Sequence, residues 1–314
     1  MLARGSDVRL ASLTSVYMAA IGAFAVAIGT AAHASDRQFE QTVAADPKGT
    51  VEISNVSGRV EVEAWDQNQV SISARLDSDM QKVDVNTDRG RTSIKVRMPG
   101  LAFGGADETD LKVKVPRGSE VDITAVSADI TSTGIQGAQR LKSVSGSIKA
   151  DIGQADIEAK TVSGDVVLHG QGGGGKPAEL HLISISGSIR LEHGSGDVEA
   201  NTTSGTLSVQ LDTARSVRMR TISGDVSLRG KLTKDADVDA QTVSGGIKMH
   251  TDSESGFEYD VNTFSGDIDN CFNAKSERTS RYGPGERLSG SLGNGSAHVR
   301  LKTMSGSINL CDKS

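Results

Sequence analysis

Aspartates that follow a glycine are the acidic residues of this sequence best suited to chemistry. Clustered carboxylates could act as general acids and bases on a polysaccharide, and a regular ladder of them could bind calcium. The candidates in the second half of the chain are Asp165, Asp197, Asp225 and Asp267. In other copies of the same local pattern the position holds Ser147, Ser188, Thr206, Gly246 or Ser307. Because Asp, Ser and Gly all suit turns, we expect a turn or surface role, with calcium binding as the alternative.

The other chemically active residue types form no recognisable site. The histidines beyond residue 34 are His169, His181, His193, His250 and His298. His169 and His250 lie too many repeats apart to share a metal, so we expect surface positions for the histidines. No Gly-x-Ser-x-Gly elbow and no phosphate-binding loop occur, and aromatic residues make up only 3% of the chain. The sequence therefore predicts no catalytic residue, no metal site and no cofactor.

A repeated tetrad, Thr/Ser-apolar-Ser-Gly, indicates which elements carry these residues. Its serine and glycine pairs are Ser145-Gly146, Ser163-Gly164, Ser186-Gly187, Ser204-Gly205, Ser223-Gly224, Ser244-Gly245, Ser265-Gly266 and Ser305-Gly306. Ser127 is a weaker copy, followed by Ala128. The gaps between successive serines from Ser127 are 18, 18, 23, 18, 19, 21, 21 and 40 residues. Repeats of this length are typical of stacked architectures.

The residues around each tetrad alternate with period two. With the serine as position 0, positions −6 and −4 before it and +3 and +5 after it are mostly apolar, as at Val226 and Ile247 (both +3). Such alternation predicts two short strands with one buried face, joined at the Ser-Gly corner. Because one repeat cannot bury its own face, we expect an all-β fold, a parallel β-solenoid of 18–21-residue rungs. An antiparallel sandwich or barrel is the alternative. The threonines at −2 share the inward parity, which argues against an outward, ice-binding ladder.

The two cysteines, Cys271 and Cys311, each lie six residues after a motif serine. A disulfide between them requires the copies at Ser265 and Ser305 to be adjacent rungs, because rungs two apart are too distant. The 40-residue gap would then contain a loop insertion at about residues 273–295, in which Ser289-Gly290 is not a rung. The alternative is a pair of free thiols.

The first 34 residues have the pattern of a secretory signal peptide. A basic start precedes an uncharged apolar run and the Ala32-His33-Ala34 site, which predicts cleavage between Ala34 and Ser35. A retained membrane anchor is the alternative; after cleavage no stable span would remain. Residues 35–118 contain strand-like runs and one tetrad, Asn55-Val56-Ser57-Gly58, and are expected to form an N-terminal β cap. Residues 119–314 are expected to form the solenoid.

This order of features resembles the bacterial putative-adhesin family of exported β-strand-repeat envelope proteins. The resemblance rests on residues 56–66 (VSGRVEVEAWD), residues 111–116 (LKVKVP) and the serial copies of the tetrad, of which 161–165 (TVSGD) is the type. It implies an exported β-helical fold and supplies no catalytic residues. The glycine run 172–175 departs from the regular repeat spacing.

Composition limits the function further. A net charge of −6 without a basic block is a poor fit to nucleic acid. We therefore expect a non-enzymatic envelope protein, in the periplasm or at the cell surface, that acts as an adhesin or a binding and scaffold surface for a protein or polysaccharide. A periplasmic stress or structural protein and a cryptic polysaccharide-active enzyme are the alternatives.

Overall fold

The computed structural model describes residues 37–77, 81–97, 108–153, 155–170, 178–252, 256–279, 283–293 and 295–311. These residues form an all-β, solenoid-like fold, and no helix occurs among them. The expected signal peptide and its cleavage site at Ala34 and Ser35 lie outside the described residues, as does the glycine run 172–175.

Six strands precede the regular repeat. They are β1 (Arg37–Ala44), β2 (Thr50–Trp65), β3 (Gln69–Leu76), β4 (Lys82–Asp88), β5 (Arg91–Arg97) and β6 (Thr109–Pro116). The strands of the repeat and its C-terminal end are β7 (Glu120–Thr133), β8 (Gln139–Ser143), β9 (Ile148–Ile152), β10 (Ile157–Thr161), β11 (Val166–Gly170), β12 (Ala178–Ser186), β13 (Ile189–Ser204), β14 (Leu207–Ser223), β15 (Val226–Ser244), β16 (Ile247–Asp252), β17 (Gly256–Ser265), β18 (Ile268–Asn270), β19 (Glu277–Arg278), β20 (Glu286–Gly293), β21 (Ala297–Ser305) and β22 (Ile308–Cys311).

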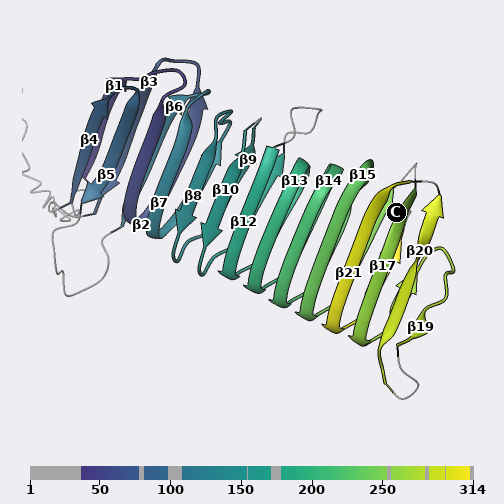
Figure 1. Ribbon diagram of the computed structural model, residues 1–314. Coiled ribbons are helices and arrows are strands. Elements are labelled where there is room, and N and C mark those ends of the chain that lie inside the picture. Colours follow the sequence, from purple (N-terminus) through teal and green to yellow (C-terminus); the bar gives the residue numbers. More distant parts are fainter. Residues whose placement is uncertain are drawn as a thin grey trace, which may run out of the picture. The chain divides into compact units, whose positions relative to one another are not determined.

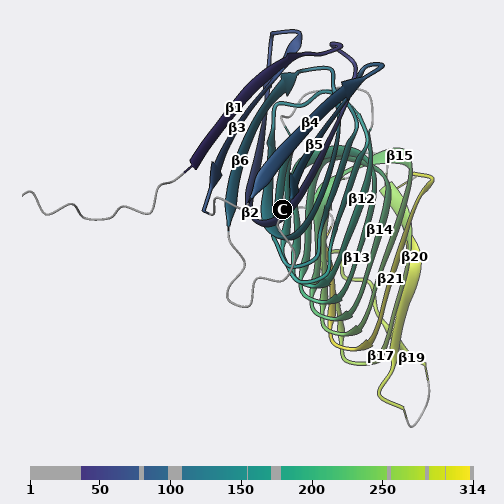
Figure 2. The same cartoon turned by 90° about the vertical axis from the view of Figure 1, so that its left-hand side faces the viewer.

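Each rung contributes one strand segment before the tetrad and one after it, and each segment pairs in parallel with its counterpart in the next rung. Ser186 pairs with Ser204, Ser204 with Ser223, and Ser223 with Ser244, so the tetrads stack in register. The aliphatic side chains of the two segments meet between the two ladders. Val226 and Ile247 are each 1% exposed and pair directly, which confirms the predicted core register. Figures 1 and 2 show the resulting stack.

The N-terminal strands extend both ladders from β2, which spans the Ser57-Gly58 tetrad. Ser57 pairs with Ser127, so β2 is itself a complete rung in contact with β7. The first half of β2 pairs with β5, which pairs with β4, while its second half pairs with β6. β3 and β1 follow β6 in antiparallel order. The segment expected as a cap therefore supplies both the first rung and the strands beyond it.

The C-terminal rungs do not stack in sequence order. β21 pairs with β15 on one side, through Ser244 and Ser305, and with β17 on the other, through Ser265 and Ser305. The last rung of the chain is thus inserted between the two rungs that precede it (Figure 1). The predicted adjacency of the Ser265 and Ser305 copies is confirmed, and the Ser244 and Ser265 copies are not neighbours because the Ser305 copy lies between them.

The segment expected as a loop insertion contains a strand that covers the end of this ladder. β20 pairs antiparallel with β17, and Gly290 lies opposite Tyr259. The expectation of a loop over 273–295 therefore fails for residues 277–278 and 286–293, which form β19 and β20, while Ser289-Gly290 is indeed not a rung. Next to this strand, Tyr259 contacts Phe257 and Phe272 with ring centroids 6.1 and 5.1 Å apart. β20 therefore covers the edge of β17, and Phe272 packs against the core beside it.

Candidate functional site

The Ser-Gly corner is built by backbone contacts between neighbouring rungs. A Cβ added at Gly224 would lie 2.1 Å from the carbonyl oxygen of Gly205, so only glycine permits this close stacking. The buried threonine at −2 satisfies a carbonyl of the adjoining corner: the Thr242 hydroxyl donates to the Gly224 carbonyl oxygen at 3.1 Å. Thr161, Thr202 and Thr303 repeat this contact at 3.0–3.1 Å. The inward threonine ladder expected from parity is therefore present.

Aspartates at position +2 also bond to the neighbouring rung. Asp129, Asp165 and Asp225 each accept a hydrogen bond of 2.8 Å from a backbone N–H of the adjoining rung. Asp267 occupies the same position and is exposed. Asp197 lies elsewhere: it sits on the strand before its tetrad, where it accepts a 2.8 Å bond from Arg215. The four aspartates considered together in the sequence therefore do not form one group.

Four of the five histidines beyond residue 34 pair with carboxylates of adjacent strands, at exposed or half-exposed positions. Their Nδ1 atoms lie 3.1–3.3 Å from carboxylate oxygens in the pairs His169–Glu192, His181–Glu199, His193–Asp212 and His298–Glu258. Within the described residues, no group of three or more histidine, cysteine or acidic side chains is arranged to hold a metal ion. These pairs act across neighbouring strands of the sheet.

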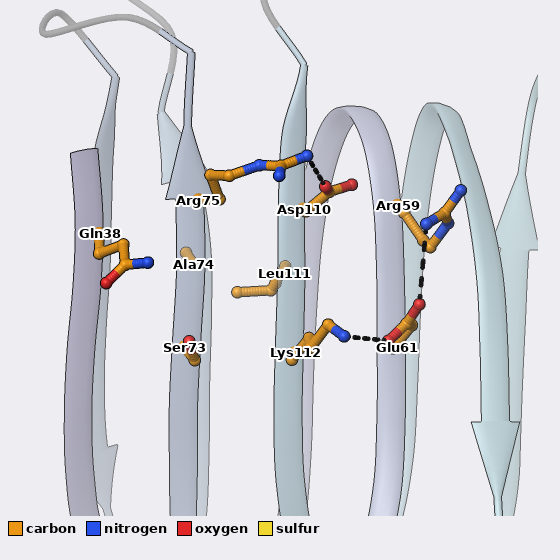
Figure 3. Close-up of a pocket in the computed structure, with 9 residues that line it drawn as sticks. All are labelled: Gln38, Arg59, Glu61, Ser73, Ala74, Arg75, Asp110, Leu111 and Lys112. Carbon is orange, nitrogen blue, oxygen red and sulfur yellow. Dashed lines mark hydrogen bonds and ion pairs between the residues drawn. The ribbon is translucent and has the colours of Figure 1, made fainter. Parts of the chain in front are cut away.

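A shallow pocket of about 210 Å³ lies on the outer face of the N-terminal strands β1, β3, β6 and β2 (Figure 3). Arg75 contacts Asp110 at 2.5 Å, and Lys112 contacts Glu61 at 3.2 Å. Each carboxylate of this pocket is thus engaged by a basic side chain of a neighbouring strand. The arrangement is that of cross-strand ion pairs on a sheet face and offers no separated acid and base.

The apolar position of the tetrad, −1, forms a different kind of surface. Nine of these side chains are exposed by 36–64% of their surface although all are large and apolar. They are Val56, Val126, Val144, Val162, Ile185, Ile222, Val243, Met304 and Phe264, in spatial order along the stack. We call this set the corner ladder. At ~4.8 Å per rung it runs for on the order of 40 Å, interrupted only by Thr203.

Charged residues of opposite sign border the corner ladder on its two sides. Position −3 carries the basic column, Lys142, Lys160, Arg220 and Lys302, and no acidic residue in any rung. Position +2, beyond the corner, carries the acidic column, Asp129, Asp165, Asp225 and Asp267. Its one basic residue is Arg59, in the first rung. All four aspartates are exposed, and the basic side chains are exposed or half-exposed.

Polar contacts hold residues at position −3 in place. The Lys160 ammonium bonds to Glu158 and lowers the pKa of that carboxyl. Asn201 donates to Glu199 at 3.1 Å, which is the main reason that the pKa of Glu199 is lowered, and His181 adds to the effect. Arg220 lies 3.6 Å from Asp239. Between this position and the ladder, a groove of about 420 Å³ follows the rungs from Asn201 to Met304.

Parity could have identified the corner ladder from the sequence. Inward positions before the serine are even, so position −1 points outward, yet it is apolar in nine rungs. The tetrad pattern by itself predicts a corner and assigns no separate role to its apolar residue. The contradiction between outward parity and apolar identity is the sequence signal for an exposed apolar surface.

The two cysteines lie on the outermost two parallel rungs. Cys271 and Cys311 form a disulfide with Cα atoms 4.9 Å apart. They follow the paired residues Asn270 and Leu310 of β18 and β22. Their shared offset from the tetrad thus places the two thiols opposite each other.

The family described as Toastrack DUF4097 matches residues 50–256 and 232–311. The chain belongs to this family. The match begins with the rung formed by β2 and ends at Cys311, so it covers the whole stack of tetrads. No curated protein sequence matches the chain.

Three solved structures of bacterial proteins are similar to this family member at low identity. A putative adhesin from Parabacteroides distasonis is 9% identical with a TM-score of 0.39, over 88% of this chain and 98% of the other. A putative adhesin from Bacteroides fragilis is 10% identical with a TM-score of 0.41, over the same shares. A putative lipid binding protein from Parabacteroides distasonis is 14% identical with a TM-score of 0.47, again over 88% and 98%. Within the described ranges, no helix is long and apolar enough to cross a bilayer.

Proposed function

We propose that this protein is an exported, non-enzymatic envelope protein that binds a macromolecular partner along its corner ladder. In this proposal the repeat region is a parallel β-solenoid, closed at its N-terminal end by a β cap, and serves as a rigid scaffold for that surface. The disulfide between Cys271 and Cys311 supports an oxidising location such as the periplasm or cell surface.

The exposure of the corner ladder is the observation that carries the proposal. Thr203 shows that a polar residue is compatible with position −1, so the fold does not require an apolar side chain there. Nine outward apolar side chains in a row expose on the order of several hundred Å², which is large for a soluble monomer. Burial of such an area is favourable by about 25 cal/mol per Å², enough to drive association once its entropic cost is met.

Site-specific photo-crosslinking in intact cells tests this proposal. A benzophenone amino acid replaces Val243 on the ladder, and a matched probe replaces Val167, an aliphatic residue that points outward at position +4 on the other strand segment. We expect a crosslinked species larger than the monomer from position 243 and none from position 167. Monomer alone at position 243, or equal crosslinking at both positions, would show that the ladder is not a binding surface.

Cell fractionation tests the location. Under the proposal the protein is recovered with the envelope, and external protease separates the surface-exposed form from a periplasmic one. Recovery in the cytosol with both thiols free would contradict the exported assignment.

A further inference from the structure

We infer that the partner on the corner ladder is a second copy of this chain, packed in parallel to form a twofold-symmetric pair of solenoids. This inference rests on the proposed function, because it names the partner of the same surface. It is carried by the pattern of charge on either side of the ladder.

Around its corner, each rung presents three outward positions in a fixed order: −3, then −1, then +2. Because the rungs stack in register, these positions form three parallel columns. The first is basic or neutral, the second is apolar, and the third is acidic or neutral from Asp129 onward. The surface therefore carries basic residues along one edge, at position −3, and acidic residues along the other edge, at position +2.

This asymmetry distinguishes the possible arrangements of two copies. A twofold axis parallel to the ladder exchanges the two edges, so the basic column of one copy faces the acidic column of the other. A twofold axis that is perpendicular to the ladder and lies in the plane of the contact does not exchange the edges. In that antiparallel arrangement the basic column of one copy faces the basic column of the other. Like charges opposite each other disfavour association, and hence the charges select the parallel pair.

The same axis also fixes the register. A pure twofold rotation leaves every rung opposite its own equivalent, so the apolar side chains at −1 meet across the axis. Arg220 and Asp225 belong to one rung, as do Lys160 and Asp165. In the parallel pair, Arg220 of one copy faces Asp225 of the other, and the exchange occurs twice in each rung.

The size of the surface fits this partner. Stable interfaces bury about 800 Å² on each partner, and the ladder with its two charged columns offers a strip of that order. The groove beside Ile222 and Val243 can receive apolar side chains from the facing ladder. An anionic lipid surface fits less well, because the acidic column would face the headgroups.

Sedimentation velocity on the purified protein, over a range of concentrations, tests for the dimer. We expect a reversible dimer whose dissociation constant rises at least about tenfold in the double variant Ile222→Thr and Val243→Thr. The control Val167→Thr should leave the constant unchanged. If a ladder variant loses its cooperative thermal transition, Val144→Thr with Val162→Thr tests the same surface at the other end of the stack.

Charge exchange within one rung tests the orientation. Arg220→Asp alone, or Asp225→Arg alone, places like charges opposite each other and should weaken the dimer by about tenfold. The double variant R220D/D225R restores opposite charges only in the parallel pair and should recover affinity to within about threefold. If the double variant is as weak as the single variants, the parallel arrangement is wrong.

The outcomes separate this inference from the proposed function. A protein that stays monomeric at all concentrations, yet crosslinks in cells from position 243, overturns the dimer and leaves the binding role intact. Flotation of that monomer with phosphatidylglycerol vesicles, lost in the ladder variant, would replace the second copy by a lipid surface. Absence of both the dimer and the cellular crosslink overturns both proposals.

Discussion

The disulfide gives the sharpest prediction, because it secures the end of β18, a short strand with few pairings of its own. β18 pairs with β22 through only three residues, from Ile268 to Asn270, and the chain then leaves the repeat. The Cys271–Cys311 bond closes a segment with a sequence separation of 40 residues. In the chain-entropy account, a loop of this length corresponds to about 4 kcal/mol of stabilisation.

The effect should be local, because stacked repeats contact only their neighbours. In the double variant Cys271→Ser and Cys311→Ser, β17, β18 and β20 should open without unfolding the rest of the stack. A loss of about 4 kcal/mol corresponds to an increase of nearly a thousandfold in the opening equilibrium of these strands.

Amide hydrogen exchange measured by mass spectrometry follows this opening segment by segment. We expect faster exchange over residues 256–272 and 286–293, which hold β17, β18 and β20, and unchanged exchange over β7 to β11. Asp269→Ser, an exposed change in the same rung that leaves the disulfide intact, is the control. Uniform acceleration along the whole stack, or no acceleration at all, would refute the assignment of the disulfide to local closure of the end.

Three further predictions concern the core, the corner and the response to acid. Ile247→Asp should lower the free energy of unfolding by several kcal/mol because it buries an unpaired charge. Lys248→Asp, at the next and exposed position, should change that free energy little. Equal effects of the two substitutions in denaturant titrations would contradict the period-two pattern. Gly224→Ala should lower the melting temperature, because the alanine Cβ would lie 2.1 Å from the Gly205 carbonyl oxygen and the backbone φ at this position is 152°. A melting curve equal to that of the wild type would show that the corner can relax. The pKa of Glu199 is lowered by its hydrogen bond from Asn201, so this carboxylate stabilises the fold above its usual pKa of 4.5 and loses that contribution as the pH falls below it. Glu199→Gln should therefore reduce the loss of thermal stability between pH 6 and pH 3. An unaltered pH profile would argue against this contribution.

Sequence periodicity determined most of the local structure. Alternation on both sides of the tetrad placed Val226 and Ile247 in the core, and the inward parity of position −2 placed Thr242 where its hydroxyl bonds to a backbone carbonyl. The equal offsets of Cys271 and Cys311 from their serines indicated that a disulfide between them needs neighbouring rungs, and the structure has both the bond and the adjacency. These features follow from local geometry, because a strand alternates its side chains and stacked copies repeat the same offset.

Only the tertiary structure decided the order in which the rungs stack. Every copy of the tetrad offers similar edges, so local preference cannot tell whether β17 or β21 should follow β15. The order depends on contacts far apart in sequence: β20 pairs with the outer edge of β17, and β21 enters between β15 and β17. Tertiary structure likewise showed that the corner ladder lies along one face with a single break at Thr203, since its nine apolar residues line up only when their rungs are stacked in register.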